Sequence, residues 1–332
     1  MLNSSMILFL STMILGTSIV VSSETWLGMW MGLEMNLISF IPLLYKSKNM
    51  ASSESCMIYF LIQSLGSMLM LISVLLNSSL VISPFMGEEF MNTALLLSMM
   101  IKLGVPPFHF WFPEILEKMS WTNCSILMTW QKIAPLCVMS YIVSNPILPI
   151  IISLTVITGA VGGLNQTSLR KIMGYSSISH MGWMIACMKF NNGSWPMYLM
   201  IYSSLILMAT ALFNSYSSFF INQMTNSSPS LMEKSLIIIM FMSLGGLPPF
   251  IGFLPKWLVI QSMIGSNSIA IMLIMAMSSL ITLFFYLRII SSTLLINSCS
   301  ISWNQNKKLN SSMVMLMITI NASLPVIAML SF

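Results

Sequence analysis

Long apolar runs separated by short polar segments recur along the whole chain. The runs are rich in Leu, Ile, Met and Ser without strict alternation of polar and apolar positions, which favours helices over the strands of a membrane barrel. A helix needs about 20 apolar residues to cross the hydrocarbon core of a bilayer, and about eleven runs approach or exceed that length. The predicted spans are 6–22, 25–45, 56–76, 92–119, 123–143, 147–165, 169–188, 197–221, 235–262, 268–296 and 312–331.

Composition supports a membrane protein. Of the 332 residues, 57% are hydrophobic and 6% are charged, and the mean hydropathy is +0.89. Soluble domains carry about 25% charged residues, so the composition excludes a soluble enzyme and a disordered tail protein. The five cysteines lie far apart and show no metal or iron–sulfur spacing. We therefore predict an all-α integral membrane protein, with residues 1–332 forming a single membrane domain.

The basic residues divide unevenly between the two ends of the predicted spans. If the N-terminal side is called side A, loops on side B contain only Lys189, and most other basic residues lie in side A loops. The side A residues are Lys46, Lys48, Lys118, Arg170, Lys171, Lys234, Lys307 and Lys308. Because loops in the inner compartment carry an excess of Lys and Arg, this partition predicts an inner N-terminus. An odd number of spans then places the C-terminus outside.

Two predicted spans are interrupted by the same sequence pattern. The first reads GVPPF from Gly104 and continues to Pro113-Glu114, and the second reads GLPPF from Gly246 and continues to Pro255-Lys256. Adjacent prolines remove backbone donors and disfavour the helical conformation in the preceding residue, so both helices must break there. The two breaks cross the predicted membrane in opposite directions. This pattern is typical of inverted repeats, in which paired broken helices mark a binding or conduction site.

Four ionisable residues lie deep within predicted spans: Glu34, Lys102, Lys132 and Lys256. Each would cost about 2.5–3.5 kcal/mol if it faced lipid at the helix centre. Together they would cost about as much as the whole free energy of unfolding of a typical domain, which is about 5–15 kcal/mol. They must therefore face protein, one another or internal water. A further basic residue within a span, Arg288, is expected to extend toward side A.

The surroundings of these residues are consistent with an interior position. Gly28 and Gly32 form a GxxxG pattern, which predicts a close helix contact. Pro135 has no N–H for the carbonyl of Gln131, and this leaves an unpaired polar group beside Lys132.

Proton transfer is the chemistry that these residue types favour. Burial favours the neutral form of a lysine, whereas a nearby carboxylate favours the charged form. A Glu–Lys pair therefore releases a proton when the carboxylate moves away. His180, with Ser176 and Ser177 one turn earlier, either extends such a relay or is a hydrogen-bonded packing residue. The alternative to proton transfer is that all of these ionisable residues form buried ion pairs that only fix the packing of the helices.

Four segments resemble a known family. They are WLGMWMGLEMNL at 26–37, KLGVPPFHFWFPE at 102–114, TWQK at 129–132 and GFLPKW at 252–257. In this order they resemble the chain 2 family of mitochondrial NADH:ubiquinone oxidoreductase, respiratory complex I. The resemblance extends along the whole chain, which also looks mitochondrially encoded and arthropod-like.

The resemblance implies an antiporter-like fold and a role for each ionisable residue. It implies two inverted five-helix repeats, 1–143 and 147–296, each with a broken helix, followed by a C-terminal helix at 312–331. Glu34 would be the carboxylate that pairs with Lys102, Lys132 the connecting lysine, and Lys256 the terminal lysine leading to the outer compartment. His180 lies where a bridging histidine would be expected.

The resemblance also implies a cellular setting. The chain would be a proton-translocating, multi-pass subunit of the mitochondrial inner membrane, with its N-terminus in the matrix and its C-terminus in the intermembrane space. It would contact other membrane-arm subunits and phospholipids in a hetero-oligomer, and would bind no nucleic acid, cofactor or metal. NADH, FMN, iron–sulfur clusters and ubiquinone would be bound by other subunits.

The chain departs from the family pattern at one end. Bacterial relatives have fourteen helices, and the first three have no counterpart among the predicted spans. Two alternative functions remain: a standalone cation/proton antiporter, and a purely structural subunit of the membrane arm.

Overall fold

The computed structural model describes residues 4–45, 49–79, 84–143, 145–191, 193–226, 231–296 and 311–323. Within these ranges the elements are helices, with one isolated antiparallel bridge between Ser168 and Phe220. Lys46, Lys48, Lys307, Lys308 and the end of the predicted span 312–331 lie outside the described residues. The chain forms two compact units, residues 1–148 (unit 1) and residues 149–332 (unit 2).

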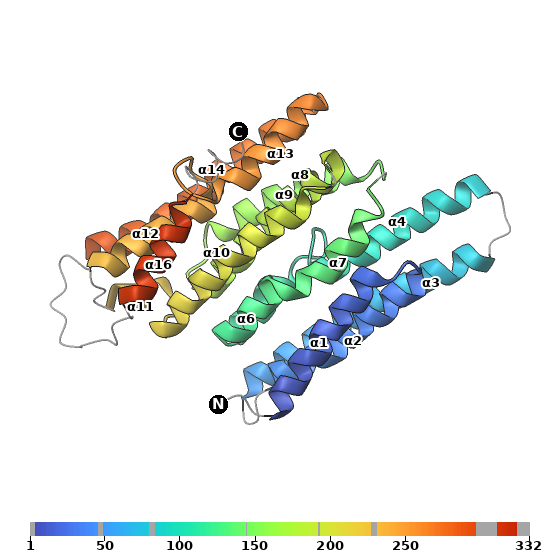
Figure 1. Ribbon diagram of the computed structural model, residues 1–332, viewed down its shortest axis with the longest axis horizontal. Coiled ribbons are helices and arrows are strands. Elements are labelled where there is room, and N and C mark those ends of the chain that lie inside the picture. Colours follow the sequence, from blue (N-terminus) through green and yellow to red (C-terminus); the bar gives the residue numbers. More distant parts are fainter. Residues whose placement is uncertain are drawn as a thin grey trace. The chain divides into compact units, whose positions relative to one another are not determined.

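Unit 1 begins with four long helices, each packed against the next. The first three, α1, α2 and α3, run side by side (Figure 1), and α7 also contacts α1, α2 and α4. Its helices are α1 (Ser4–Ser22), α2 (Trp26–Leu44), α3 (Met50–Ser79), α4 (Pro84–Leu103), α5 (Trp111–Lys118), α6 (Trp121–Met128) and α7 (Trp130–Ser140).

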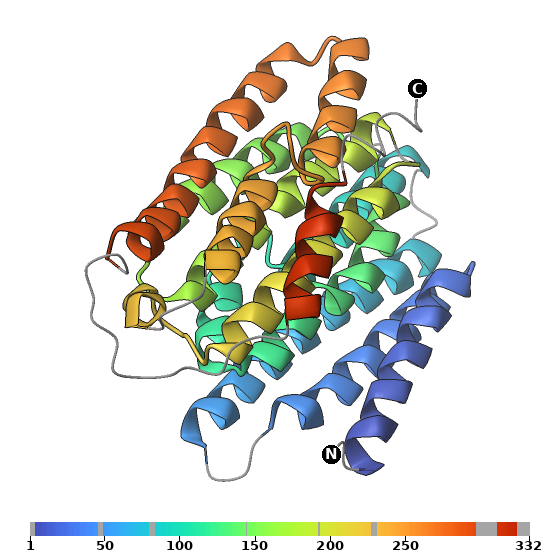
Figure 2. The same ribbon diagram turned by 60° about the vertical axis from the view of Figure 1, so that its left-hand side comes forward.

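Unit 2 is built around α12, which contacts α10, α14 and α16. Figure 2 shows α16, in red, alongside α12. The helices are α8 (Leu148–Gly163), which begins at the last residue of unit 1, α9 (Leu169–Phe190), α10 (Trp195–Ser215), α11 (Ile221–Asn226), α12 (Leu231–Gly245), α13 (Phe253–Gly265), α14 (Ile269–Ser291), the π-helix η1 (Ser292–Ile296) and α16 (Ser311–Asn321).

Among the described residues, five helices are long and apolar enough to cross a membrane, namely α1, α2, α3, α10 and α14. Two predicted spans are broken, as expected: 92–119 into α4 and α5, and 235–262 into α12 and α13. A third break was not predicted. The span 123–143 divides at Thr129, whose hydroxyl donates to the carbonyl of Ser125 at 2.7 Å.

The contact between α1 and α2 uses only one glycine of the predicted GxxxG pattern. A Cβ on Gly32 would lie 2.8 Å from the carbonyl oxygen of Gly16, so the two backbones meet there. The prediction is wrong for Gly28, which packs against Ser23 and Thr25 in the turn before α2. Gly28 belongs to the first helical turn, where its N–H donates to the capping hydroxyl of Thr25 at 3.3 Å.

The two predicted breaks share a set of backbone hydrogen bonds and differ at one peptide bond, Pro106–Pro107, which is cis. Gly104 and Gly246 have φ angles of +68° and +77°, a conformation that glycine adopts without steric cost. Each glycine follows its helix in a Schellman motif, and each bond of the first break recurs in the second 142 positions later. The bonds run from Gly104 N to Ile101 O, Val105 N to Met100 O and Phe108 N to Val105 O, and from Gly246 N to Ser243 O, Leu247 N to Met242 O and Phe250 N to Leu247 O.

Candidate functional site

Two of the predicted lysines line one small cavity in unit 1. Lys102 belongs to the last turn of α4 and Lys132 to the first turn of α7, and their exposed fractions are 5% and 3%. The cavity has a volume of about 20 Å³. A cavity of about 10–15 Å³ by this measure holds one water molecule, so the space between these helices accommodates a single water.

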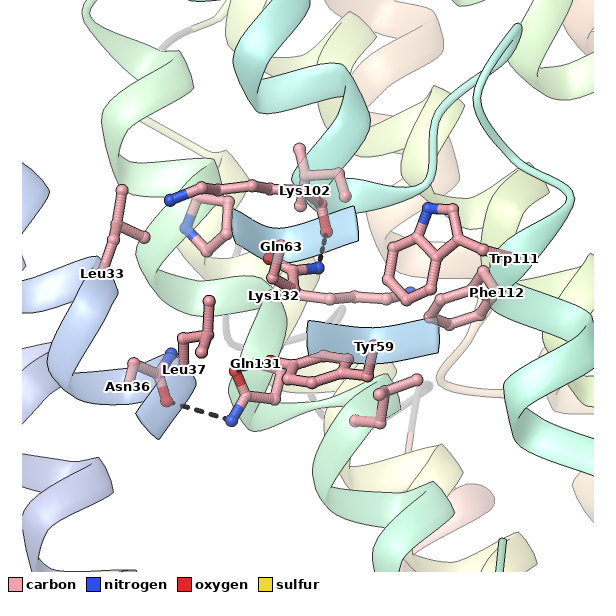
Figure 3. A pocket seen from close by; sticks show the side chains of 13 residues that line it. Leu33, Asn36, Leu37, Tyr59, Gln63, Lys102, Trp111, Phe112, Gln131 and Lys132 are labelled. Carbon is pink, nitrogen blue, oxygen red and sulfur yellow. Dashed lines mark hydrogen bonds between the residues drawn. The ribbon is translucent and has the colours of Figure 1, made fainter. Parts of the chain in front are cut away.

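The two side chains extend in opposite directions across this region (Figure 3). Lys102 points toward Leu33 on α2, whereas Lys132 points toward the ring of Phe112, whose centroid lies 5.5 Å from its Nζ atom. The half-buried carboxylate of Glu34, also on α2, attracts the Lys102 ammonium electrostatically. Within the described ranges, however, no ion pair of 4.0 Å or shorter joins these two residues. Their attraction therefore acts without direct contact.

A chain of amide and hydroxyl groups lies beside the two lysines. The Nε2 atom of Gln131 donates to Oδ1 of Asn36 at 3.0 Å, and the hydroxyl of Tyr59 donates to Oε1 of Gln131 at 3.3 Å. Asn36 and Tyr59 are each 3% exposed. These bonds connect α7 to α2 and α3, and all three residues line the cavity.

The first break leaves one carbonyl that a distant side chain satisfies. The carbonyl of Lys102 would accept from position 106 in a continuing helix, but Pro106 has no N–H. The Nε2 atom of Gln63, on α3, donates to this carbonyl at 3.0 Å, and Figure 3 shows this bond. Gly66, one turn further along α3, makes room for the lysine, because a Cβ there would lie 2.8 Å from Cγ of Lys102.

In unit 2, Lys256 lies directly against the second break. Its side chain is 6% exposed, and its ammonium donates to the carbonyl of Gly245 at 2.8 Å. That carbonyl would accept from position 249 in a continuing helix, where Pro249 has no N–H. The ammonium therefore caps the C-terminus of α12, where the helix dipole favours positive charge. It also lies 5.7 Å from the ring centroid of Trp183 on α9.

His180 lies one turn before Trp183 on α9 and is 7% exposed. Its Nδ1 atom is 3.0 Å from the hydroxyl of Tyr198, and its ring centroid is 5.1 Å from that of Tyr202. The histidine is therefore hydrogen-bonded inside unit 2. This geometry is compatible with both roles considered for it, proton transfer and packing.

Arg288 has a structural role. Its guanidinium donates to the backbone carbonyls of Leu164 and Gln166, each at 2.6 Å. These carbonyls follow the end of α8, so the arginine anchors the loop that leads into α9.

Comparison with known proteins places the chain in a family. The family model described as NADH:quinone oxidoreductase/Mrp antiporter, TM, matches residues 23–282. NADH-ubiquinone oxidoreductase chain 2 of Locusta migratoria is 43% identical over 99% of this chain and 94% of its own length. The protein of the same name from Anopheles gambiae is 45% identical over 92% of this chain and 91% of its own length. The chain belongs to the NADH-ubiquinone oxidoreductase chain 2 family.

The fold of this chain 2 family member also matches solved structures. A chain of respiratory complex I from Thermus thermophilus superposes with a TM-score of 0.82, at 19% identity over 95% of this chain and 75% of that one. A chain of the Mrp complex from Dietzia sp. gives a TM-score of 0.75, at 15% identity over 91% of this chain and 61% of that one. These matches confirm the predicted all-α, antiporter-like fold.

Sequence reasoning missed the polar side chains that surround the lysines of this chain 2 family member. Tyr59 and Gln63 are four residues apart, and so occupy one face of α3. A lone amide such as Gln63 within an apolar span is itself a signal of an interior or functional position. The described residues contain no group of three or more His, Cys or Glu side chains placed to hold a metal ion.

Proposed function

We propose that this chain translocates protons across the mitochondrial inner membrane as a membrane-arm subunit of respiratory complex I. Other subunits carry out NADH oxidation and ubiquinone reduction, and that reaction drives the transfer. The proton route includes Glu34, Lys102, Lys132 and Lys256, with His180 as an additional member.

The shared cavity of Lys102 and Lys132 is the observation that carries this proposal. Two buried lysines line this space, so a water molecule bound in it would be one element of a proton route that joins α4 to α7. Glu34 attracts the Lys102 ammonium from α2. A movement of α2 that changes this attraction would change which lysine holds the proton, so the protonation steps are coupled.

The two breaks extend the proposal to the whole fold. Their backbone bonds match at a constant spacing, which supports two five-helix repeats, 1–143 and 147–296. The predicted spans carry the breaks across the membrane in opposite directions, the arrangement of inverted repeats. Together with the partition of basic residues, this predicted topology supports an N-terminus in the matrix and a C-terminus in the intermembrane space.

The proposed partners follow from family membership. The chain assembles with other membrane-arm subunits and with phospholipids in a hetero-oligomer. NADH, FMN, iron–sulfur clusters and ubiquinone belong to those other subunits, and this chain contributes proton transfer alone.

Replacing Lys102 with Met, or Glu34 with Gln, tests the proposal in the assembled complex. Each substitution keeps side-chain length while removing the titrating group. Proton transfer by a positioned group contributes about 10²–10⁴-fold to a rate, so NADH-driven proton uptake by vesicles containing the complex should fall by about 100-fold or more. The matched control is Lys189→Met, at the end of α9, which should leave proton uptake unchanged.

The same measurements separate the proposal from a purely structural role. A structural subunit would show less assembled complex in the Lys102 and Glu34 variants, but an unchanged number of protons moved per NADH. Wild-type proton stoichiometry in both variants would contradict the proposal.

A further inference from the structure

We infer that Gln131 is a positioning residue for proton transfer: its side-chain amide holds α2 and α3 against α7 and fixes the cavity shared by Lys102 and Lys132. This inference rests on the proposed function and adds a residue to it. Gln131 precedes Lys132 in the first turn of α7, so any movement of its amide acts on the start of the helix that carries this lysine.

Both polar ends of the Gln131 amide are used in bonds to other helices. The nitrogen donates to Asn36 on α2 and, at 3.4 Å, to the sulfur of Met13 on α1, and the oxygen accepts from Tyr59 on α3. Asn36 lies two residues after Glu34 on the same helix. One side chain therefore connects the helix of the carboxylate to the helix of the connecting lysine, and the close-up shows the Asn36 bond beside both lysines (Figure 3).

The local backbone explains why this helix end needs an external anchor. α7 starts directly after the break at Thr129, and Pro135 removes the helical donor for the carbonyl of Gln131. The first turn of α7 is therefore held by fewer backbone bonds than a turn in the middle of a helix. Bonds from the Gln131 side chain to three neighbouring helices, α1, α2 and α3, compensate for this loss.

An amide is suited to positioning and not to carrying the proton itself. A glutamine amide does not titrate in water, and here its donor and acceptor are both directed at fixed partners. The cavity holds about one water, so a small displacement of α7 would change the space available to that water. Fixing the size of this cavity is the role that we assign to Gln131.

Gln131→Met tests the assignment, because Met has similar length and cannot make the bonds to Asn36, Tyr59 and Met13. One neutral hydrogen bond contributes about a fivefold factor, so losing the two to Asn36 and Tyr59 should lower NADH-driven proton uptake by about 5- to 25-fold in vesicles containing the complex. Tyr59→Phe keeps the ring, which packs against Phe40 with centroids 5.1 Å apart, and should cost about fivefold. The matched control is Gln261→Met, at an exposed position on α13.

Two further variants separate positioning from a merely structural role. Adding Tyr59→Phe to Gln131→Met should change nothing more, because the bond is already lost. Gln131→Glu keeps an acceptor for Tyr59, and the Asn36 amide can turn to donate to it. This variant should restore proton uptake to within about twofold of wild type.

The outcomes distinguish failure of this inference from failure of the proposed function. Wild-type proton uptake in Lys102→Met would contradict the proposed function. Loss of uptake in Lys102→Met, with wild-type uptake and pH profile in Gln131→Met, would contradict only the role of Gln131. Additive losses in the double variant, or equal loss in Gln131→Glu and Gln131→Met, would also overturn it.

Discussion

The two helix breaks share their backbone hydrogen bonds and differ in the side chains that satisfy their free carbonyls. Each leaves a carbonyl without its helical donor, because prolines follow. In unit 1 the neutral amide of Gln63 satisfies this carbonyl, so the ammonium of Lys102 is left to face Glu34. In unit 2 the ammonium of Lys256 itself satisfies the carbonyl of Gly245. The two carbonyls are not equivalent, since that of Lys102 corresponds to Leu244 and that of Gly245 corresponds to Leu103, and one is satisfied by an amide and the other by a charge.

This difference gives the two lysines different tasks. The proton of Lys102 responds to a carboxylate on another helix, whereas that of Lys256 also takes part in the bond that caps α12. A charge-assisted hydrogen bond is about twice as strong as a neutral one. Loss of the Lys256 proton should therefore weaken the second break, while loss of the Lys102 proton leaves the first break intact.

The side chains that surround the lysines at the two breaks also differ. Amides and a tyrosine hydroxyl line the cavity of unit 1. The lysine of unit 2 faces Trp183, one turn from the buried His180 and its partner Tyr198. The position that follows the later proline is also used differently, since Glu114 is exposed in an ion pair and Lys256 is buried.

Glycine substitution at the second break should have the largest effect. A Cβ on Gly252 would lie 1.8 Å from the carbonyl oxygen of Ser243, a backbone atom that cannot turn aside. Gly252→Ala should therefore cost more than about 3 kcal/mol and abolish assembly, measured as the amount of intact complex. The counterpart in unit 1 is Phe110, which is 72% exposed, so Phe110→Ala should assemble normally.

Gly265→Ala is the control for this experiment, because nothing lies within 4 Å of a Cβ there. Normal assembly of Gly252→Ala would show that the second break has room for a Cβ at this position, as the first break has at Phe110. The two breaks would then not differ in this respect.

Replacement of the capping groups should have an intermediate effect. Lys256→Met leaves the Gly245 carbonyl buried and unsatisfied, at a cost of about 1–3 kcal/mol, and Gln63→Met does the same to the carbonyl of Lys102. Hydrogen exchange of the assembled complex, measured by mass spectrometry, should become faster at the second break in the first variant and at the first break in the second.

Lys102→Met provides the matched comparison, because this lysine lies at the first break without capping it. Exchange at that break should remain as in the wild type. Equal acceleration in Lys102→Met and Lys256→Met would mean that both lysines support their breaks alike.

A feature of the fold or the site could be predicted from the sequence when the residues that cause it lie close together along the chain. Both breaks could be predicted because the glycine and prolines that cause them are adjacent in sequence. The groups that repair them could not, since Gln63 is 39 residues from Lys102 and Asn36 is 95 from Gln131. Membrane helices also bury and expose apolar residues alike, so the apolar residues do not mark which face turns inward. The break at Thr129 lacked a glycine or proline signal.

The smallest effect is expected from the salt bridges of Lys118, which join α5, the second half of the first broken helix, to α3. Lys118 donates to Glu54 on α3 and to Glu114 on α5. Both carboxylates are more than half exposed, so these pairs contribute less than about 1 kcal/mol. The fully buried side chains of Ile115 and Leu116 hold α5 in place without them. Lys118→Met should lower the melting temperature of the complex only slightly.

The pH dependence of this small effect follows from the lysine. Partial burial alone would lower the pKa of Lys118, but its bonds to the two glutamates outweigh this and raise the pKa above its ordinary value. A raised pKa adds stability that persists at neutral pH and is lost only above about pH 10.4. The melting difference between wild type and Lys118→Met should therefore stay constant between about pH 7 and 9. A difference that disappears within that interval would mean that Lys118 is not charged in its pairs. If Lys118→Met lowered the melting temperature as much as Lys256→Met does, a lysine charge would stabilise both breaks to the same extent.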